Sequence, residues 1–398
     1  MFFKLIRFIL YALLLFAIVV LGSCAPARTI LQQADLSPNS QIASRYDVPT
    51  AQDFKQFQDI LLGAYRLPSQ FELQDRKTLS DDWLDGRASV EERTYLVSHG
   101  ANADSLSVVF IHNNQDSEAP LLITQNFTGN RTVVARGGES PLPGEAQSFG
   151  VLGSIFGYFF GRYIVEHPYE DILDRGYSIA VMYPPQYVPD RAAAGLEKLD
   201  QLFPNFGPSR PGALSVWASL SDALAREIKS NAPTRKIIAY GHSRYGKTAL
   251  IAAAMSDHVD AAISHQSGTV GASLLRDDTG ETLGDIVKAY PHWVAPLAMD
   301  YADNPTTLPV DAPALLAAIA PKPVLLGNAR RDVWSDPEGA FIAAKIAAPA
   351  WGSDGFSAIR LDDFKPEDKI SFWIRPGTHG IVKEDWPAFL DFLDAHFK

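Results

Sequence analysis

The chain has 398 residues, of which 46% are hydrophobic and 20% are charged, and this balance is that of an ordinary globular protein with one large or two average domains. Its net charge of −11 argues against nucleic acid and anionic membrane surfaces as electrostatic partners. The one cysteine, Cys24, excludes a disulfide within the chain.

The first residues have the composition of an export signal. Lys4 and Arg7 precede an apolar run over residues 8–20, which is short and wrongly flanked for a spanning helix. We therefore expect residues 1–23 to be a signal peptide, although an uncleaved N-terminal anchor remains an alternative.

The end of this signal resembles a bacterial lipobox, with Cys24 at the position that is lipidated. This resemblance implies a lipid-anchored protein of the outer membrane, or else of the periplasm. Cleavage near residues 25–27 is the alternative and would free the protein. Residues 24–50 are rich in small and polar residues and predict a tether, followed by a domain over residues 51–398.

The beginning of that domain carries little periodicity. Residues 51–100 predict short helical segments mixed with polar loops that pack against a sheet edge. Two glycine clusters make residues 136–165 a candidate insertion at the rim of a cleft. The polar loop 125–130 lies where a hydrolase supplies a second oxyanion N–H group, although a plain polar turn explains it equally well.

The middle of the chain alternates between strand and helix patterns. Apolar runs predict strands at 105–111, 120–124, 176–183 and 235–240, and a helix at 213–229. This alternation implies an α/β protein with a mostly parallel central sheet, right-handed crossovers and a three-layer αβα arrangement.

A glycine-flanked turn joins the last of these strands to a helical run. Ser243 lies in this turn, between Gly241 and Gly246, in the pattern of a nucleophile elbow. Tyr245 departs from that pattern, since a small residue usually stands two positions after the serine. A capping serine is the bland alternative. A phosphate-binding loop is disfavoured, because the residues between the two glycines are bulky.

Two further residues follow in the order that α/β hydrolases use for a catalytic triad. Asp332 comes after the predicted strand at 323–328, where the carboxyl end of a strand faces an active-site crevice. His379 lies in a turn-rich loop between the strand at 370–375 and a final helix at 386–397. Surface or capping roles are the alternatives for both residues.

The chemistry of a serine esterase assigns a role to each residue. We expect His379 to take the proton from Ser243 and Asp332 to fix the imidazole tautomer. Arg244 follows the serine directly, so its N–H group and its guanidinium are candidates for stabilising an oxyanion. Lys247 lies one helical turn further on and could donate to substrate hydroxyls.

The segment from Gly241 to Lys247 resembles the Gly-Cys-Ser-Arg-x-Gly-Lys motif of the glucuronoyl esterases, carbohydrate esterase family fifteen. Similar segments recur in the same order between about residues 236 and 380. The resemblance implies the α/β-hydrolase fold, no cofactor, and hydrolysis of glucuronate or 4-O-methylglucuronate esters. It also implies that Lys247, Glu281 and Trp334 contact the sugar.

Two residues depart from the family pattern. His242 replaces a cysteine, which we expect only to repack the interior. Gln266 stands where the family commonly carries the catalytic Glu, and an amide cannot ionise. Asp332 has then either taken over this role, or the triad is degenerate.

The sequence therefore predicts a monomeric, secreted serine esterase that acts on glucuronoyl esters of plant or algal polysaccharide. The nine histidines show no metal-ligand spacing, so no metal is expected. An acetyl or feruloyl esterase on the same scaffold is one alternative. A surface lipoprotein that binds carbohydrate without hydrolysing it is another, and Gln266 is its main support.

Overall fold

The computed structural model describes residues 32–37, 47–100, 102–130, 163, 167–277 and 279–398. The predicted signal peptide, Cys24 and nearly all of the candidate insertion at 136–165 lie outside the described residues. Within these ranges, no helix combines the length and the apolar character needed to cross a bilayer.

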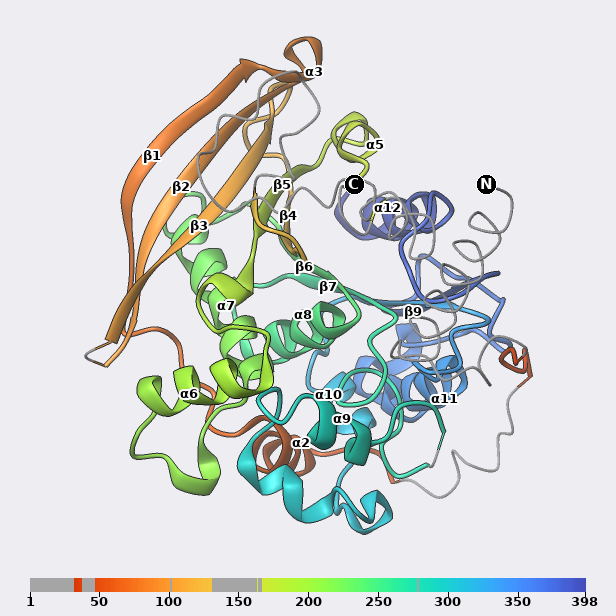
Figure 1. The fold of residues 1–398 in the computed structure, drawn as a ribbon. Coiled ribbons are helices and arrows are strands. Elements are labelled where there is room, and N and C mark those ends of the chain that lie inside the picture. Colours follow the sequence, from red (N-terminus) through yellow and green to blue (C-terminus); the bar gives the residue numbers. More distant parts are fainter. Residues whose placement is uncertain (1–31, 38–46, 101, 131–162, 164–166, 278) are drawn as a thin grey trace, which may run out of the picture.

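A twisted sheet runs through the described part of the chain (Figure 1), with nine strands in the order β1-β2-β3-β5-β4-β6-β7-β8-β9. The pairs from β1 to β5 are antiparallel, and all pairs from β5 to β9 are parallel. The strands are β1 (Gln70–Asp82), β2 (Ala88–His99), β3 (Asn102–Asn113), β4 (Leu121–Gln125), β5 (Ser178–Met182), β6 (Ile237–His242), β7 (Ala261–His265), β8 (Val324–Ala329) and β9 (Ile370–Arg375).

Helices cover both faces of this sheet (Figure 1). One face carries α2 (Ala51–Phe57), α7 (Ala213–Asn231), α8 (Arg244–Met255), α10 (Ala312–Ala317) and α11 (Pro337–Ala347), and the other carries α5 (Tyr169–Asp174) and α12 (Asp385–Phe397). The remaining helical segments are η3 (Gln58–Leu62), α3 (Trp83–Gly86), η6 (Pro184–Gln186), α6 (Ala192–Leu202), η7 (Gly207–Ser209), α9 (Leu283–Ala289), η8 (Pro296–Tyr301), η9 (Pro305–Thr307) and η10 (Ala348–Asp354).

Alternation along the strands divides the apolar core into two layers. In β6, Ile237 and Ala239 pack with the α7 and α8 side, whereas Ile238 and Tyr240 pack with the α12 side. Successive side chains of a strand point to opposite faces, so a strand buried on both faces is apolar throughout. The predicted three-layer αβα arrangement with a mostly parallel sheet is therefore confirmed.

The prediction for residues 51–100 was wrong in its second half. This region contains the two long strands β1 and β2, which extend the sheet rather than pack against its edge. Most of β1 is exposed, including seven consecutive residues from Glu72 to Thr78 that are nearly all open to solvent. A strand exposed on both faces carries no alternation of apolar and polar residues, and so its sequence resembles a loop.

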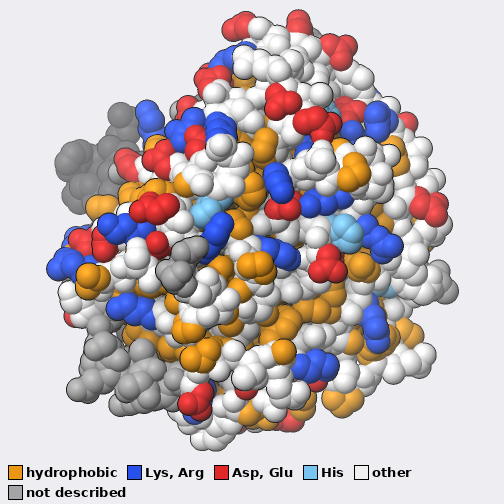
Figure 2. Space-filling model, turned by 180° about the vertical axis from the view of Figure 1, so that it is seen from behind, with side chains coloured by type: hydrophobic (Ala, Val, Ile, Leu, Met, Phe, Trp, Pro, Cys, Tyr) orange, Lys and Arg blue, Asp and Glu red, His pale blue; other side chains and the backbone are white. Residues whose placement is uncertain are grey.

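The surface charge is mixed on the face drawn in Figure 2. Acidic and basic side chains are interspersed there, and hydrophobic side chains reach the surface between them. The net charge of −11 is thus not gathered into one patch on this face.

Candidate active site

Ser243 lies in a strained turn between β6 and α8. Its backbone adopts φ 57° and ψ −125°, a conformation that costs a non-glycine residue on the order of 1–3 kcal/mol. Its N–H group donates to the carbonyl oxygen of His265 at 2.8 Å, which ties the turn to the neighbouring strand β7. The predicted elbow geometry is therefore present.

The glycines of the elbow are required by close backbone approaches. A Cβ atom at Gly241 would lie 2.0 Å from the carbonyl oxygen of Tyr245, and one at Gly246 would lie 3.1 Å from Ser267 Cβ. The Tyr245 side chain points into the core, where its ring lies 5.8 Å from that of Trp217. After the serine, the close contact thus falls at position 246 and not at position 245, which explains why a tyrosine is tolerated at position 245.

The structure brings Asp332 and His379 together. Asp332 Oδ2 lies 2.7 Å from His379 Nδ1, and Ser335 Oγ lies 3.3 Å from the same nitrogen. The two residues follow β8 and β9, which are adjacent parallel strands, so their loops meet at one edge of the sheet. Burial by itself would raise the pKa of Asp332, but the charge and hydrogen bond of His379 outweigh it and lower that pKa.

The imidazole of His379 also lies beside the elbow. Its ring centroid is 4.6 Å from that of His242, the residue immediately before Ser243. Among the described residues, no hydrogen bond joins the Ser243 hydroxyl to His379. Catalytic hydrogen bonds are often loose before substrate binds, so proximity is the informative observation here.

His242, which stands where the family carries a cysteine, contacts a second buried histidine. Its Nδ1 lies 3.2 Å from Nδ1 of His265, and both rings are fully buried. Burial, and then the proximity of His379 and His265, hold the pKa of His242 well below its usual value. The imidazole of His242 that lies beside His379 is thus neutral.

Gln266 occupies a different position from that of a triad acid. Its Oε1 accepts a hydrogen bond from the N–H group of Gly380 at 2.9 Å, and its Nε2 donates to the carbonyl oxygen of Thr378 at 3.3 Å. These two contacts flank His379 on either side along the chain. The amide therefore holds the backbone of the histidine loop, and the carboxylate beside the imidazole is that of Asp332.

The Arg244 guanidinium forms an ion pair that the sequence analysis missed. Its Nη1 donates to Oδ2 of Asp190, which lies in the loop between η6 and α6. The carboxylate also accepts hydrogen bonds from His292 Nε2 at 3.0 Å and from Trp293 Nε1 at 2.8 Å. Asp190 could have been found by the same rule as Asp332, because its loop follows the carboxyl end of β5.

Lys247 and Glu281 form a second, more deeply buried ion pair. Their side chains are only 3% and 12% exposed, and Lys247 Nζ lies 3.4 Å from Glu281 Oε2. The same ammonium donates to the carbonyl oxygens of Ser267 and Thr269, each at 2.5 Å. Burial lowers the pKa of Lys247, which the charge of Glu281 opposes. The three protons of Lys247 are thus directed at protein acceptors.

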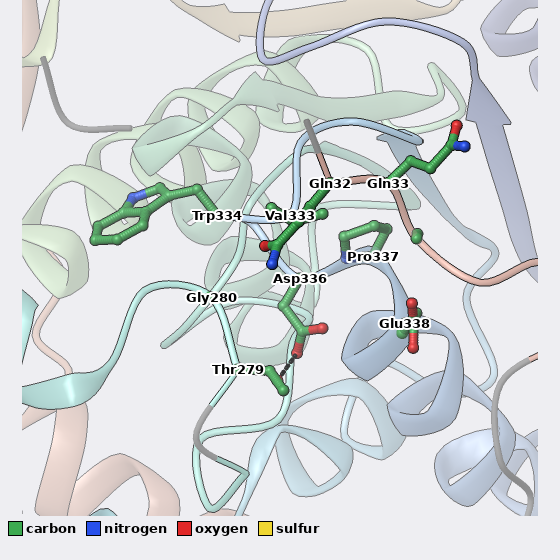
Figure 3. A pocket seen from close by; sticks show the side chains of 10 residues that line it. Gln32, Gln33, Thr279, Gly280, Val333, Trp334, Asp336, Pro337 and Glu338 are labelled. Atoms are coloured by element: carbon green, nitrogen blue, oxygen red, sulfur yellow. Dashed lines mark hydrogen bonds between the residues drawn. The ribbon is translucent and has the colours of Figure 1, made fainter. Parts of the chain in front are cut away.

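Trp334 lies next to this pair. Its carbonyl oxygen accepts a hydrogen bond from the N–H group of Glu281 at 2.8 Å. Trp334 also borders a pocket of about 460 Å³, which is lined by residues 32–34, 279–280, 333–334 and 336–338. Figure 3 shows the Trp334 ring pointing away from Gln32 and Pro337, so the ring lies at the margin of this pocket.

The loop at 125–130 borders the elbow as well. The ring of Phe127 lies 6.0 Å from that of His242 and 5.6 Å from the guanidinium carbon of Arg244.

Within the described residues, no group of three or more His, Cys, Asp or Glu side chains is arranged to hold a metal ion.

Comparison with known proteins agrees with this geometry. Residues 177–355 match the family model described as glucuronyl esterase, fungi. Carbohydrate esterase MZ0003, from an unknown prokaryotic organism, is 33% identical over 240 residues, which make up 57% of this chain and 55% of that protein. The central part of the chain is therefore similar to the glucuronoyl esterases.

More distant members extend the comparison. The 4-O-methyl-glucuronoyl methylesterase 1 of Wolfiporia cocos is 29% identical over 140 residues, or 32% of this chain and 34% of that protein. The structure of a glucuronoyl esterase from Solibacter usitatus superposes with a TM-score of 0.74 at 24% identity, covering 87% of this chain and 92% of that one. This likeness confirms the α/β-hydrolase fold. The chain spans about half or less of the length of these two curated relatives.

The matched region contains most of the candidate site. Ser243, Asp332 and Asp190 fall within residues 177–355, whereas His379 lies beyond them. The resemblance that the elbow motif predicted is thus confirmed, and the roles of the individual residues rest on the geometry described above.

Proposed function

We propose that this protein is a serine esterase that hydrolyses glucuronoyl esters, including those of 4-O-methylglucuronate, on plant or algal polysaccharide. The observation that carries this proposal is the 2.7 Å contact between Asp332 and His379 beside the strained Ser243 turn. The family, and the name of the Wolfiporia cocos relative, support the uronate ester as the substrate class.

In this mechanism His379 removes the proton of the Ser243 hydroxyl as its oxygen attacks the ester carbonyl. Asp332 keeps the proton of the neutral imidazole on Nδ1, so that Nε2 is free to act as the base. The alcohol leaves with the transferred proton, and water then hydrolyses the acyl-enzyme by the same steps.

The oxyanion formed in each step requires hydrogen-bond donors. Arg244 is the first residue of α8, and the N–H groups of the first helical turn have no acceptor within the helix. Its guanidinium, which is paired with Asp190, offers a further N–H donor at the same place. Donors of this kind are each worth about 10²–10³-fold in turnover.

We assign the sugar contacts to Glu281, Trp334 and Lys247. Because Lys247 already has three protein acceptors, a sugar hydroxyl would replace the longest contact, the 3.4 Å one to Glu281. The indole of Trp334 offers a face for stacking on a pyranose ring and an N–H donor.

Hydrolysis of benzyl glucuronate, compared with acetyl and feruloyl esters, tests the proposal. We expect turnover of the glucuronate ester to exceed that of the other two, and Ser243→Ala to abolish it. Preference for an acetyl or feruloyl ester would replace the substrate class with one of the alternatives. Carbohydrate binding without turnover by the wild type would indicate a binding protein instead.

We also propose export with lipidation at Cys24, on the basis of the sequence alone. Labelling with a palmitate analogue in a bacterial host should mark the wild-type chain and not the Cys24→Ala variant. A chain that is exported but unlabelled would indicate ordinary signal cleavage.

A further inference from the structure

The ion pair between Arg244 and Asp190 stands immediately beside the proposed nucleophile. Arg244 is adjacent to Ser243 in the chain, and its side chain is 23% exposed, whereas that of Asp190 is 13% exposed. Among the described residues, no acceptor is hydrogen-bonded to the second terminal nitrogen of the guanidinium, Nη2. This nitrogen is therefore available to an oxygen of a ligand.

Asp190 is itself held in place from behind. Two donors from consecutive residues, His292 Nε2 and Trp293 Nε1, both point at its Oδ1, while Oδ2 receives Arg244. Burial would raise the pKa of Asp190, but these hydrogen bonds and the charge of Arg244 hold it at about 2. The residue is thus a carboxylate with a fixed orientation.

Aromatic rings restrict the guanidinium on its other sides. Its central carbon lies 4.8 Å from the ring centroid of Trp293, 5.5 Å from that of Tyr290 and 5.6 Å from that of Phe127. Trp293 and Tyr290 are stacked on each other at 4.0 Å. Arginine loses much side-chain freedom in such a setting, because both its charge and its plane are matched.

The charges beside the elbow are therefore compensated in pairs. Arg244 faces Asp190, and Lys247 faces Glu281, so each cation has a carboxylate of its own. Ester hydrolysis converts a neutral acyl group into a carboxylate anion. An uncompensated arginine at this place would bind that product more tightly than it binds the ester.

We propose that Asp190 is a positioning residue that fixes the Arg244 guanidinium beside Ser243 and cancels its charge, so that the site accepts a neutral uronate ester and releases the uronate anion. This inference rests on the proposed esterase function. The Asp190 carboxylate then has two separate effects: it orients the guanidinium donor of Arg244, and it favours release of the uronate product.

Asp190→Asn tests both effects, because the amide keeps the shape of the side chain and loses its charge. We expect kcat for benzyl glucuronate to fall by about 10²-fold, the loss typical of one oxyanion donor. We expect free glucuronate to inhibit the variant about tenfold more strongly than the wild type. The second effect should shrink at about 0.5 M salt, where charges are screened.

Asp190→Glu keeps the charge and shifts the carboxylate by one methylene. We expect it to lower kcat while leaving inhibition by glucuronate unchanged, and it replaces the first variant if that one does not fold. In an Arg244→Gln background, Asp190→Asn should have little further effect, because the residue acts through the arginine. Asp174→Asn, which breaks the exposed ion pair with Arg87, is the control for removing an ion-paired carboxylate elsewhere.

The results distinguish this inference from the proposed function. An active wild type with unchanged kcat and unchanged product inhibition in Asp190→Asn would overturn the role of Asp190 alone. A wild type without turnover would overturn the esterase function. Calorimetric titration with glucuronate would still measure whether Asp190→Asn binds the anion more tightly, and equal binding would then refute the charge effect as well.

Discussion

The two sides of Ser243 are built in different ways. On one side, Asp332 contacts His379 across the ends of β8 and β9, two neighbouring parallel strands. On the other side, Arg244 contacts Asp190, whose loop follows β5, a strand separated from β6 by β4. The first pair is a consequence of sheet order, whereas the second depends on a loop that reaches past a strand.

This difference shows which residue pairs the order of the strands brings into contact. Residues at the carboxyl ends of adjacent parallel strands meet in any fold of this kind. A carboxylate in a longer loop meets its partner only because other residues, here His292 and Trp293, hold it there. We therefore expect substitutions on the imidazole side to act mainly on chemistry, and those on the cationic side to act on folding as well.

The largest effect is expected from Asp332→Asn. The amide would stabilise the wrong imidazole tautomer, and comparable substitutions in a catalytic triad lower kcat about 10⁴-fold. Turnover of benzyl glucuronate measures this loss. Asp336→Asn, four residues further along the same segment, is the matched control and should change kcat little. Equal activities of Asp332→Asn and the wild type would remove Asp332 from the triad.

Lys247→Met should have the largest effect on stability. It leaves Glu281 buried without its cation, and breaking a buried pair from one side costs about 3–5 kcal/mol. Urea unfolding measures this loss, and the double variant with Glu281→Gln should recover part of it. Lys198→Met disrupts a more exposed pair with Asp104 and should cost less than about 1 kcal/mol. Similar losses of unfolding free energy in Lys247→Met and Lys198→Met would show that the buried pair contributes no more stability than the exposed one.

Asp336 is an acid on the imidazole side that has no ion pair with any cation in the described part of the chain. Burial raises its pKa to about 6, against 3.8 for the unperturbed group. Between these two values the folded state binds the proton more tightly than the unfolded state does, so the wild type loses stability as the pH rises through this window.

Asp336→Asn removes that titration. Relative to the wild type, we expect the free energy of unfolding of the variant to rise by about 2 kcal/mol between pH 4 and pH 7. This is less than the full pKa shift corresponds to, because pH 4 already lies above the pKa of 3.8 of the unperturbed group. Urea unfolding at the two pH values measures the gain. A difference that stays constant with pH, or that reverses, would contradict the raised pKa.

The smallest effect is expected from Gln266→Glu. A carboxylate can still accept from Gly380, but it cannot donate to the carbonyl oxygen of Thr378. We expect kcat to fall about tenfold through displacement of the His379 loop, with little change in KM. Gln58→Glu removes a comparable amide contact to Gly63 and serves as the control. A higher kcat in Gln266→Glu would instead assign a second acid to this position.

Local patterns predicted most of the parallel half of the molecule. The strand, turn and helix around Ser243 follow from a glycine where a Cβ atom would lie only 2.0 Å from the carbonyl oxygen of Tyr245, and from apolar runs that are buried on both faces. The order Ser243, Asp332, His379 was predicted from the chain order of the triad in α/β hydrolases. Strand β1 was missed, because residues exposed on both faces carry no periodic signal. Strand β2, which is buried or half-buried throughout, was missed with it.

The sequence by itself thus determined the elbow, the parallel strands and the residues at their ends, since each depends on preferences within about ten neighbouring positions. Only the tertiary structure decided that Gln266 supports the histidine loop, that Lys247 faces Glu281, and that Asp190 reaches Arg244. These contacts join positions 34 to 114 residues apart, and side-chain packing across layers, which no local pattern encodes, selects among the possible partners.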